Sequence, residues 1–286
     1  MKKAPNPRLV LSFAMAVFGT LGLFTRFIPV SSGELALYRA VLAALLLCGY
    51  FAATRQKLEL KTVGRELPLL LLSGALMGIN WILLFQAYRY TTVSVATLSY
   101  YFAPVIVTVA STFLFREKLT GKQIFCFVMS TVGLVLVIGV GDLGGSSLKG
   151  VLFGLGAACF YASVVLLNKF IKKVSGIHRT LLQFFAAIVV LTPYVAVTSG
   201  FHPEVLDATG WICLLVVGLF HTGVTYCLYF TSVQHLPGQE VSILSYVDPL
   251  VAVVVSVLIL REPLTLSQAL GGAMILGFTL WNEKNS

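Results

Sequence analysis

Charged side chains are scarce in this chain, and no polar stretch is long enough to form a soluble domain. Only 11% of the 286 residues are Asp, Glu, Lys or Arg, whereas 58% are hydrophobic, and the mean hydropathy is +0.92. Soluble domains carry about 25% charged residues. The composition therefore excludes a soluble enzyme or binding module and predicts a chain embedded in a lipid bilayer.

The motifs of several common enzyme classes are missing as well. The sequence contains no His-Glu-x-x-His, no Gly-x-Ser-x-Gly and no Walker phosphate loop, so a metalloprotease, a serine hydrolase and an ATP-driven pump lack the residues that they need. The five cysteines form no Cys-x-x-Cys pair, which predicts packing residues rather than a zinc site. We expect no enzymatic activity, no cofactor and no metal.

Apolar stretches recur along the whole chain, each near the roughly 20 residues that a helix needs to cross a hydrocarbon core. The alternation of polar and apolar residues that is typical of a membrane barrel is absent. The pattern predicts an all-α polytopic membrane protein with ten transmembrane helices. The expected spans are 9–28, 34–53, 67–88, 94–115, 122–140, 150–168, 178–198, 208–230, 240–260 and 266–281.

The second half of the chain repeats the first at an offset of 145 residues. Pro104 and Arg116–Thr120 recur as Pro249 and Arg261–Thr265. A match over many positions indicates a duplicated unit, which divides the chain into repeats 1–140 and 141–286. The same offset relates Gly78 with Gly223, Phe85 with Phe230, Leu98 with Ile243, Tyr101 with Tyr246 and Gln123 with Gln268.

Lysine and arginine gather in alternate loops, which predicts the orientation of the chain. With the N-terminus in the cytoplasm, 15 of them lie inside. Both termini are then expected on the cytoplasmic side of the cytoplasmic membrane, and the net charge of +9 needs no nucleic-acid partner. Those left on the outer side are Arg26, Arg89, Lys149 and Arg261.

An odd number of spans in each repeat makes the second copy enter the membrane from the opposite side. Two inverted five-helix repeats are typical of secondary transporters, because two like halves can open alternately to either side around a shared midplane site. The sequence therefore predicts alternating access to a small-molecule substrate. Spans one to four and six to nine are expected to enclose the cavity.

One motif in the second span and others near the end of each repeat match a known pattern. They are LYRAVLAA at Leu37–Ala44, QAYRYTTVSVA at Gln86–Ala96, Pro104, Glu117–Thr120, Tyr246–Pro249 and Glu262–Thr265. As a set they resemble the EamA family of the drug/metabolite transporter superfamily, over nearly the whole chain. The resemblance implies ten helices, export of amino acids or similar metabolites, and peripheral positions for spans five and ten. Arg89 departs from the family, which commonly has a small or apolar residue there.

Few ionisable residues lie inside the expected spans, and these are the candidates for substrate binding or proton coupling. Asp248, in span nine, suits a substrate amine or a proton; a structural acid bonded to neighbouring helices is the alternative. Arg39, in span two, suits a substrate carboxylate, unless it snorkels to the outer interface beside Glu34. His221, in span eight, could relay a proton or serve as a neutral packing group. Arg39 and Asp248 are expected to lie too far apart to pair.

Polar and aromatic positions recur in both repeats and are candidates for lining the cavity. Asn80 and Trp81 correspond to Thr225 and Tyr226 at the repeat offset. Together with Tyr101 and Tyr246, they favour an apolar or aromatic amino acid as substrate. Helix packing or an interfacial aromatic belt is the alternative for each of them.

Glycines spaced four residues apart predict close helix packing within the bundle. The pairs are Gly74 with Gly78 and Gly150 with Gly154, and small residues at this spacing let two helix backbones approach each other in lipid. A homodimer face is the second interpretation. A non-transporting membrane scaffold or sensor, and an intramembrane enzyme, stay open as alternative functions, although His221 has no obvious nucleophile partner.

Overall fold

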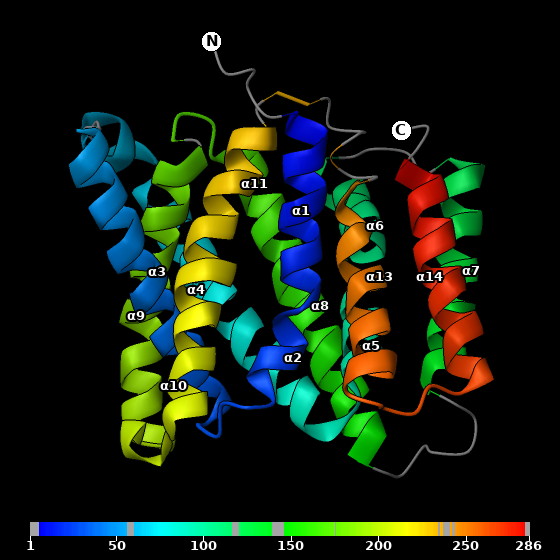
Figure 1. Cartoon of the computed structure of the whole chain (residues 1–286). Coiled ribbons are helices and arrows are strands. Elements are labelled where there is room, and N and C mark those ends of the chain that lie inside the picture. Colours follow the sequence, from blue (N-terminus) through cyan, green and yellow to red (C-terminus); the bar gives the residue numbers. More distant parts are fainter. Residues whose placement is uncertain are drawn as a thin grey trace.

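The computed structural model describes residues 6–55, 60–115, 120–138, 146–174, 176–233, 235–236, 241 and 244–283, and this part of the chain contains helices and no strand (Figure 1). The first repeat contains α1 (Pro7–Gly19), α2 (Leu21–Thr25), α3 (Ser32–Thr54), α4 (Leu60–Tyr90), α5 (Val93–Tyr100), α6 (Ala103–Phe115) and α7 (Gly121–Ile138). The second contains α8 (Ser146–Phe170), α9 (Gly176–Thr198), the 3-10 turn η1 (Pro203–Val205), α10 (Ala208–Leu215), the π-helix η2 (Val216–Val224), α11 (Thr225–Val233), α13 (Val247–Val254), the π-helix η3 (Val255–Ile259) and α14 (Leu266–Glu283).

Within the described residues, seven helical segments are long and apolar enough to cross a membrane. The prediction of an all-α polytopic membrane protein is confirmed. The expected spans around 122–140, 240–260 and 266–281 contain the helices α7, α13 with η3, and α14 in their described parts, but they are not among the seven. The seven are Pro7–Thr25, Ser32–Thr54, Val63–Tyr90, Val93–Leu114, Ser147–Phe170, Gly176–Thr198 and Ala208–Ser232.

The helices run side by side, and α1 begins at the same end of the bundle at which α14 ends (Figure 1). We call the opposite end, at which α3, α5, α8, α10 and α14 begin, the distal end. α4 packs against α8 and α9, α3 against α9 and η2, and α1 against α11 and α13. α7 and α14 pack against each other at one edge of the bundle (Figure 1).

The repeated Thr-x-x-Gln motif forms the same N-terminal cap on two helices. The Thr120 hydroxyl accepts a hydrogen bond from the Gln123 N–H (3.2 Å), and the Gln123 side chain accepts one from the Thr120 N–H (2.8 Å). Thr265 and Gln268 make the same reciprocal pair, at 3.2 and 3.0 Å. Each is a capping box, which begins α7 in one repeat and α14 in the other. The rest of the first copy, Arg116–Leu119, lies outside the described residues, as does the expected repeat boundary at residue 140.

The repeated prolines begin new helices. Pro104 lies in the first turn of α6 and Pro249 in the first turn of α13, where a missing N–H is tolerated. Pro249 would otherwise donate to the carbonyl of Ser245, four residues earlier. That carbonyl lies 3.5 Å from the Tyr101 hydroxyl, whose one proton is donated to Asp248 at 2.6 Å. The end of α5 therefore contacts the start of α13 through Tyr101.

Glycine lets α4 and α9 approach closely, as the sequence predicts. A Cβ atom at Gly74 would lie 2.5 Å from the carbonyl oxygen of Gln183 and 2.6 Å from the Cβ of Ala186. Gly150 and Gly154 likewise pack against residues of α5 and the turn before it. Both glycine pairs are therefore packing positions inside the bundle.

Gly74→Ala is expected to lower stability by about 1–3 kcal/mol, because the added methyl group meets a backbone carbonyl that cannot move away. Gly64→Ala is the matched control, since it lies in the same helix and its Cβ would meet nothing within 4 Å. It is expected to be neutral or stabilising, by about 0.5–1 kcal/mol. Thermal unfolding of the purified variants in detergent measures both. Equal midpoints for the two would contradict the packing role of Gly74.

Candidate functional site

A buried arginine and three aromatic side chains from four helices meet near the middle of the bundle. Arg39 of α3 is 3% exposed, and its guanidinium carbon lies 4.4 Å from the centre of the Trp81 ring of α4. Phe184 of α9 contacts Trp81 at a ring separation of 5.7 Å and Tyr226 of α11 at 5.6 Å. We call Arg39, Trp81, Phe184 and Tyr226 the central cluster.

The central cluster consists of two pairs of residues related by the repeat offset. Arg39 corresponds to Phe184, and Trp81 corresponds to Tyr226, each 145 residues apart. The contact of Arg39 with Trp81 therefore has its counterpart in the contact of Phe184 with Tyr226. The halves differ in chemistry at this point, because the first repeat supplies a cation where the second supplies a phenyl ring. The sequence analysis missed Phe184, which the offset from Arg39 could have revealed.

One hydroxyl holds the Arg39 side chain in place. Arg39 Nε donates to Thr222 Oγ1 at 3.1 Å, and the Thr222 hydroxyl donates in turn to the Val217 carbonyl at 2.7 Å. Close packing makes this contact possible, because a Cβ at Gly218 of η2 would lie 2.6 Å from the Cβ of Leu42 in α3. The widened π-turn thus presents Thr222 to α3, as π-helices frequently do at functional sites.

No acidic side chain neutralises Arg39 within the part of the chain that the structure describes. Its Nη1 and Nη2 atoms also have no hydrogen-bond partner there. Arg39 forms no ion pair with Glu34 in the described part of the chain. The Glu34 carboxylate instead accepts from the backbone N–H groups of Ser31 (3.0 Å) and His202 (2.7 Å). A buried guanidinium with two free donor nitrogens is suited to bind an anionic group.

Asp248 lies in the first turn of α13 and is held by a tyrosine of the first repeat. The Tyr101 hydroxyl donates to Asp248 Oδ2 at 2.6 Å, and the Tyr101 ring lies 6.4 Å from that of its repeat counterpart Tyr246. Asp248 forms no ion pair with Arg39 in the described structure, which agrees with the expected separation. The bond joins the end of α5 to α13. Asp248 therefore makes a contact of the kind expected for a structural acid bonded to a neighbouring helix.

His221 joins η2 to the end of α1. Its Nδ1 lies 3.2 Å from the Val216 carbonyl and its Nε2 lies 2.9 Å from the Thr20 hydroxyl. The imidazole is 2% exposed and packs edge-on against Phe24, with ring centres 5.0 Å apart. Both ring nitrogens are engaged, as expected for a packing and hydrogen-bonding group. Its role in proton coupling stays a prediction.

Asn80 and Thr225 use their polar groups inside the bundle. Asn80 Nδ2 donates to the Ala157 carbonyl of α8 at 2.6 Å, and Thr225 donates to the Phe220 carbonyl of its own helix at 2.8 Å. Both side chains are buried. These bonds support helix packing, and the structure does not bring the two residues together with Arg39 as free polar groups.

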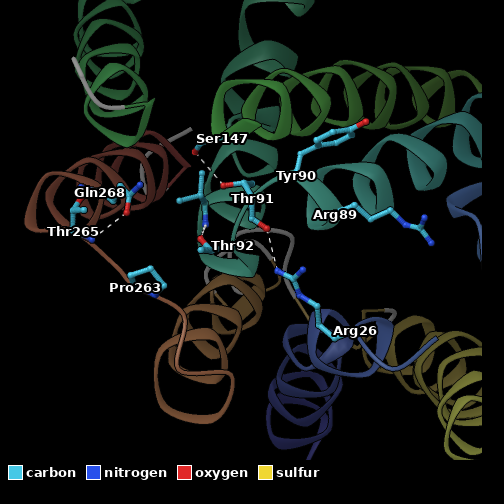
Figure 2. A pocket seen from close by; sticks show the side chains of 10 residues that line it. Arg26, Arg89, Tyr90, Thr91, Thr92, Ser147, Pro263, Thr265 and Gln268 are labelled. Carbon is cyan, nitrogen blue, oxygen red and sulfur yellow. Dashed lines mark hydrogen bonds between the residues drawn. The ribbon is translucent and has the colours of Figure 1, made fainter. Parts of the chain in front are cut away.

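A cavity of about 370 Å³ lies at the distal end of the bundle, and Figure 2 shows the side chains that line it. Arg26 points at Thr91, whose carbonyl accepts from Arg26 Nη2 at 3.1 Å (Figure 2). None of the residues predicted to line a substrate cavity lies in its wall. Its lining consists of Arg26, Arg89, Tyr90, Thr91, Thr92, Val95, Ser147, Pro263, Thr265 and Gln268.

Glu262 joins several elements beside this distal cavity. Its carboxylate pairs with Arg26, accepts from the Val93 N–H at the start of α5 at 2.7 Å and accepts from the Ser256 hydroxyl of η3 at 2.6 Å. The Ser94 N–H donates to the same Ser256 hydroxyl at 3.2 Å. We call Arg26 and Glu262 the distal latch, because their pair connects the end of α2 with α5 and η3.

The sequence of this chain is similar to that of a known protein family and to several curated proteins. The sequence pattern of the EamA-like transporter family matches residues 8–139 and 148–282. The "Uncharacterized transporter YxxF" of Bacillus subtilis (strain 168) is 31% identical, over 96% of this chain and 88% of that protein. An "Uncharacterized transporter" of Archaeoglobus fulgidus is 27% identical, over 69% of this chain and 70% of that protein.

The fold has a counterpart among solved structures. One crystal structure superimposes with a TM-score of 0.65 over 96% of this chain and 94% of its own, at 17% identity, which shows similarity of fold alone. The match to the family covers nearly the whole chain. The similar proteins named above are called transporters. The chain therefore belongs to the EamA-like transporter family of the drug/metabolite transporter superfamily.

Proposed function

We propose that this transporter carries a small zwitterion, a neutral amino acid with an apolar or aromatic side chain, out of the cell by alternating access. The observation that carries the proposal is the buried, acid-free guanidinium of Arg39 next to Trp81, Phe184 and Tyr226. A cation beside aromatic rings matches a ligand that combines a carboxylate with an apolar side chain.

Several helix contacts recur when the two halves are exchanged, and this supports the alternating-access part of the proposal. The 145-residue offset relates α1 to α8 and the second part of α4 to α11. The contact of α4 with α8 therefore has its counterpart in the contact of α11 with α1. The exchange also turns α3 against η2 into α9 against α4, and α1 against α13 into α8 against α6. Arg55 and Gly200, related by the same offset, both have left-handed backbones, with φ of 52° and 72°. Ten membrane-spanning helices, related in two sets of five by a pseudo-two-fold axis through the central cluster, would explain why these helix contacts recur in both halves.

Each part of the zwitterion has a candidate partner. The carboxylate binds Arg39, the side chain lies among Trp81, Phe184 and Tyr226, and the amine or a coupled proton is received by Asp248. Burying the guanidinium of Arg39 and the carboxylate of Asp248 in the membrane costs free energy unless these groups face protein, water or a ligand. Binding of a zwitterion compensates both, which gives the loaded carrier a lower barrier to changing its conformation than the empty carrier with two exposed charges.

The purified protein tests the cargo class directly. Neutral aromatic and branched amino acids are expected to raise the thermal unfolding midpoint, because a ligand at 100 times its Kd stabilises the folded state by about 2.7 kcal/mol. The corresponding amines without a carboxylate, quaternary cations, sugar phosphates and nucleosides are expected to leave it unchanged. The best ligand then goes into proteoliposomes, where counterflow measures transport and an imposed pH gradient tests proton coupling. Stabilisation by sugar phosphates or nucleosides alone would replace the amino acid with another cargo.

A further inference from the structure

We infer that the distal cavity is a second binding site, which receives the carboxylate group of the cargo at the end of the bundle proposed to face outward. The inference rests on the proposed function for the identity of the cargo, but its site is separate from the central cluster. The distal cavity shares no lining residue with that cluster.

Two exposed guanidinium groups line the distal cavity and keep most of their donors available. Arg26 makes its hydrogen bonds to Thr91 and Glu262 through Nη2 alone. Arg89 donates to the Val30 carbonyl through Nη2 alone. Within the described residues, Nε and Nη1 of both arginines therefore have no protein acceptor. Each of these free N–H groups can donate one charge-assisted hydrogen bond to a carboxylate oxygen.

Three helices direct their N-termini at the same cavity. Thr92 is the N-cap of α5, Ser147 is in the first turn of α8, and Thr265 caps α14. All three residues belong to the cavity wall. Each helix N-terminus carries the positive end of a macrodipole, which attracts an anion within the first turn. The arrangement adds to the field of the two arginines.

Positively charged residues occur at the distal cavity, although most lysines and arginines of the chain lie on the expected cytoplasmic side. Lysine and arginine are rare on the expected outer side, yet two of the four residues there, Arg26 and Arg89, line the cavity wall. The other two, Lys149 and Arg261, follow or precede wall residues Ser147 and Pro263 by two positions in the sequence. Glu262 is the acid beside them, and its oxygens already bind Arg26, the Val93 N–H and Ser256. A net positive site at a membrane surface raises the local concentration of anions.

Arg26 connects this site to the distal latch. A carboxylate that accepts from a free N–H of Arg26 shares the guanidinium with Glu262, so the two carboxylates repel each other and compete for it. Binding at the distal cavity therefore weakens the pair that connects α2 with α5 and η3. The site is placed to admit or release cargo as the latch opens.

Cysteine labelling measures this site without any transport. Ser147→Cys in a background with the five native cysteines replaced gives a reporter in the cavity wall. An anionic sulfonate methanethiosulfonate and a cationic trimethylammonium one are compared on purified protein. Arg26→Gln and Arg89→Gln are each expected to lower the anion-to-cation rate ratio by about fourfold, as follows for one charge about 10 Å away in water. Arg65→Gln, at the other end of α4, is the charge-matched control and should leave the ratio unchanged.

Protection by a ligand completes the test. Millimolar benzoate is expected to slow labelling by a neutral methanethiosulfonate, whereas benzylamine is not. Protection should be lost in Arg26→Gln and in Arg89→Gln but kept in Arg39→Gln. Because Arg89→Gln does not change the Arg26–Glu262 pair, its effect reports on the cavity and not on the latch. Equal protection by benzylamine, or protection that survives both distal substitutions, would overturn the inference. Loss of protection in Arg39→Gln alone would assign the carboxylate to the central cluster, and neither result depends on whether amino acids are transported.

Discussion

Arg39→Gln is expected to reduce transport by about 100-fold or more. The substitution removes the one lysine or arginine that is buried among the described residues, and losing one partner of a desolvated charge pair costs about 2–5 kcal/mol. The Trp81 and Thr222 contacts of Arg39 are expected to be replaced without collapse of the site, because glutamine retains a donor of similar reach. Counterflow in proteoliposomes with the amino acid selected by thermal shift measures the loss.

Two companion measurements separate binding from folding at Arg39. A structural role predicts a lower thermal midpoint for Arg39→Gln, whereas removal of a buried charge that lacks an acid partner predicts an unchanged or higher midpoint. Arg39→Lys keeps the charge and loses the planar two-pronged donor, so it should retain a weakened transport with a raised KM. Wild-type flux in a folded Arg39→Gln protein would remove Arg39 from the cargo site and, with it, the main support for a carboxylate-bearing substrate.

Asp248→Asn is expected to abolish net transport while leaving folded protein in the membrane. Asparagine keeps the size of the side chain and accepts the Tyr101 hydrogen bond, which is 2.6 Å long in the present structure, but it can neither bind a proton nor balance a substrate amine. Two assays distinguish these roles. If Asp248 carries the coupled proton, exchange of labelled substrate at equilibrium persists and only flux driven by a pH gradient is lost. If it binds the amine, both are lost.

Tyr101→Phe is the matched control for Asp248. It deletes the hydroxyl that holds the carboxylate and keeps the ring that lies near Tyr246. A charge-bearing role of Asp248 predicts a loss of severalfold in Tyr101→Phe against a complete loss in Asp248→Asn. A purely structural role of the pair predicts equal losses of flux and of thermal midpoint in both variants. Full flux in Asp248→Asn would exclude the acid from the transport cycle.

Features that depend on short stretches of chain could be predicted from the amino-acid pattern. Apolar length set the helices, and all seven segments that qualify as spans lie at expected positions. The repeated Thr-x-x-Gln motif forms caps at Thr120 and Thr265, since a capping box is closed within four residues. Gly74 packs against α9 because helical spacing puts small residues on one face. These features need only local periodicity and local hydrogen bonding.

The contacts between residues that are distant in sequence could not be predicted in this way, and these contacts define both proposed sites. Arg39 could reach the outer interface or the bundle interior from the same position in its span. The Thr222 hydroxyl, 183 residues away in sequence, and the Trp81 ring hold it inside. The distal latch likewise joins Arg26 to Glu262 across 236 residues. Partners so far apart are selected by the packing of whole helices, because the fit of their surfaces, rather than any spacing along the chain, places the two side chains within bonding distance.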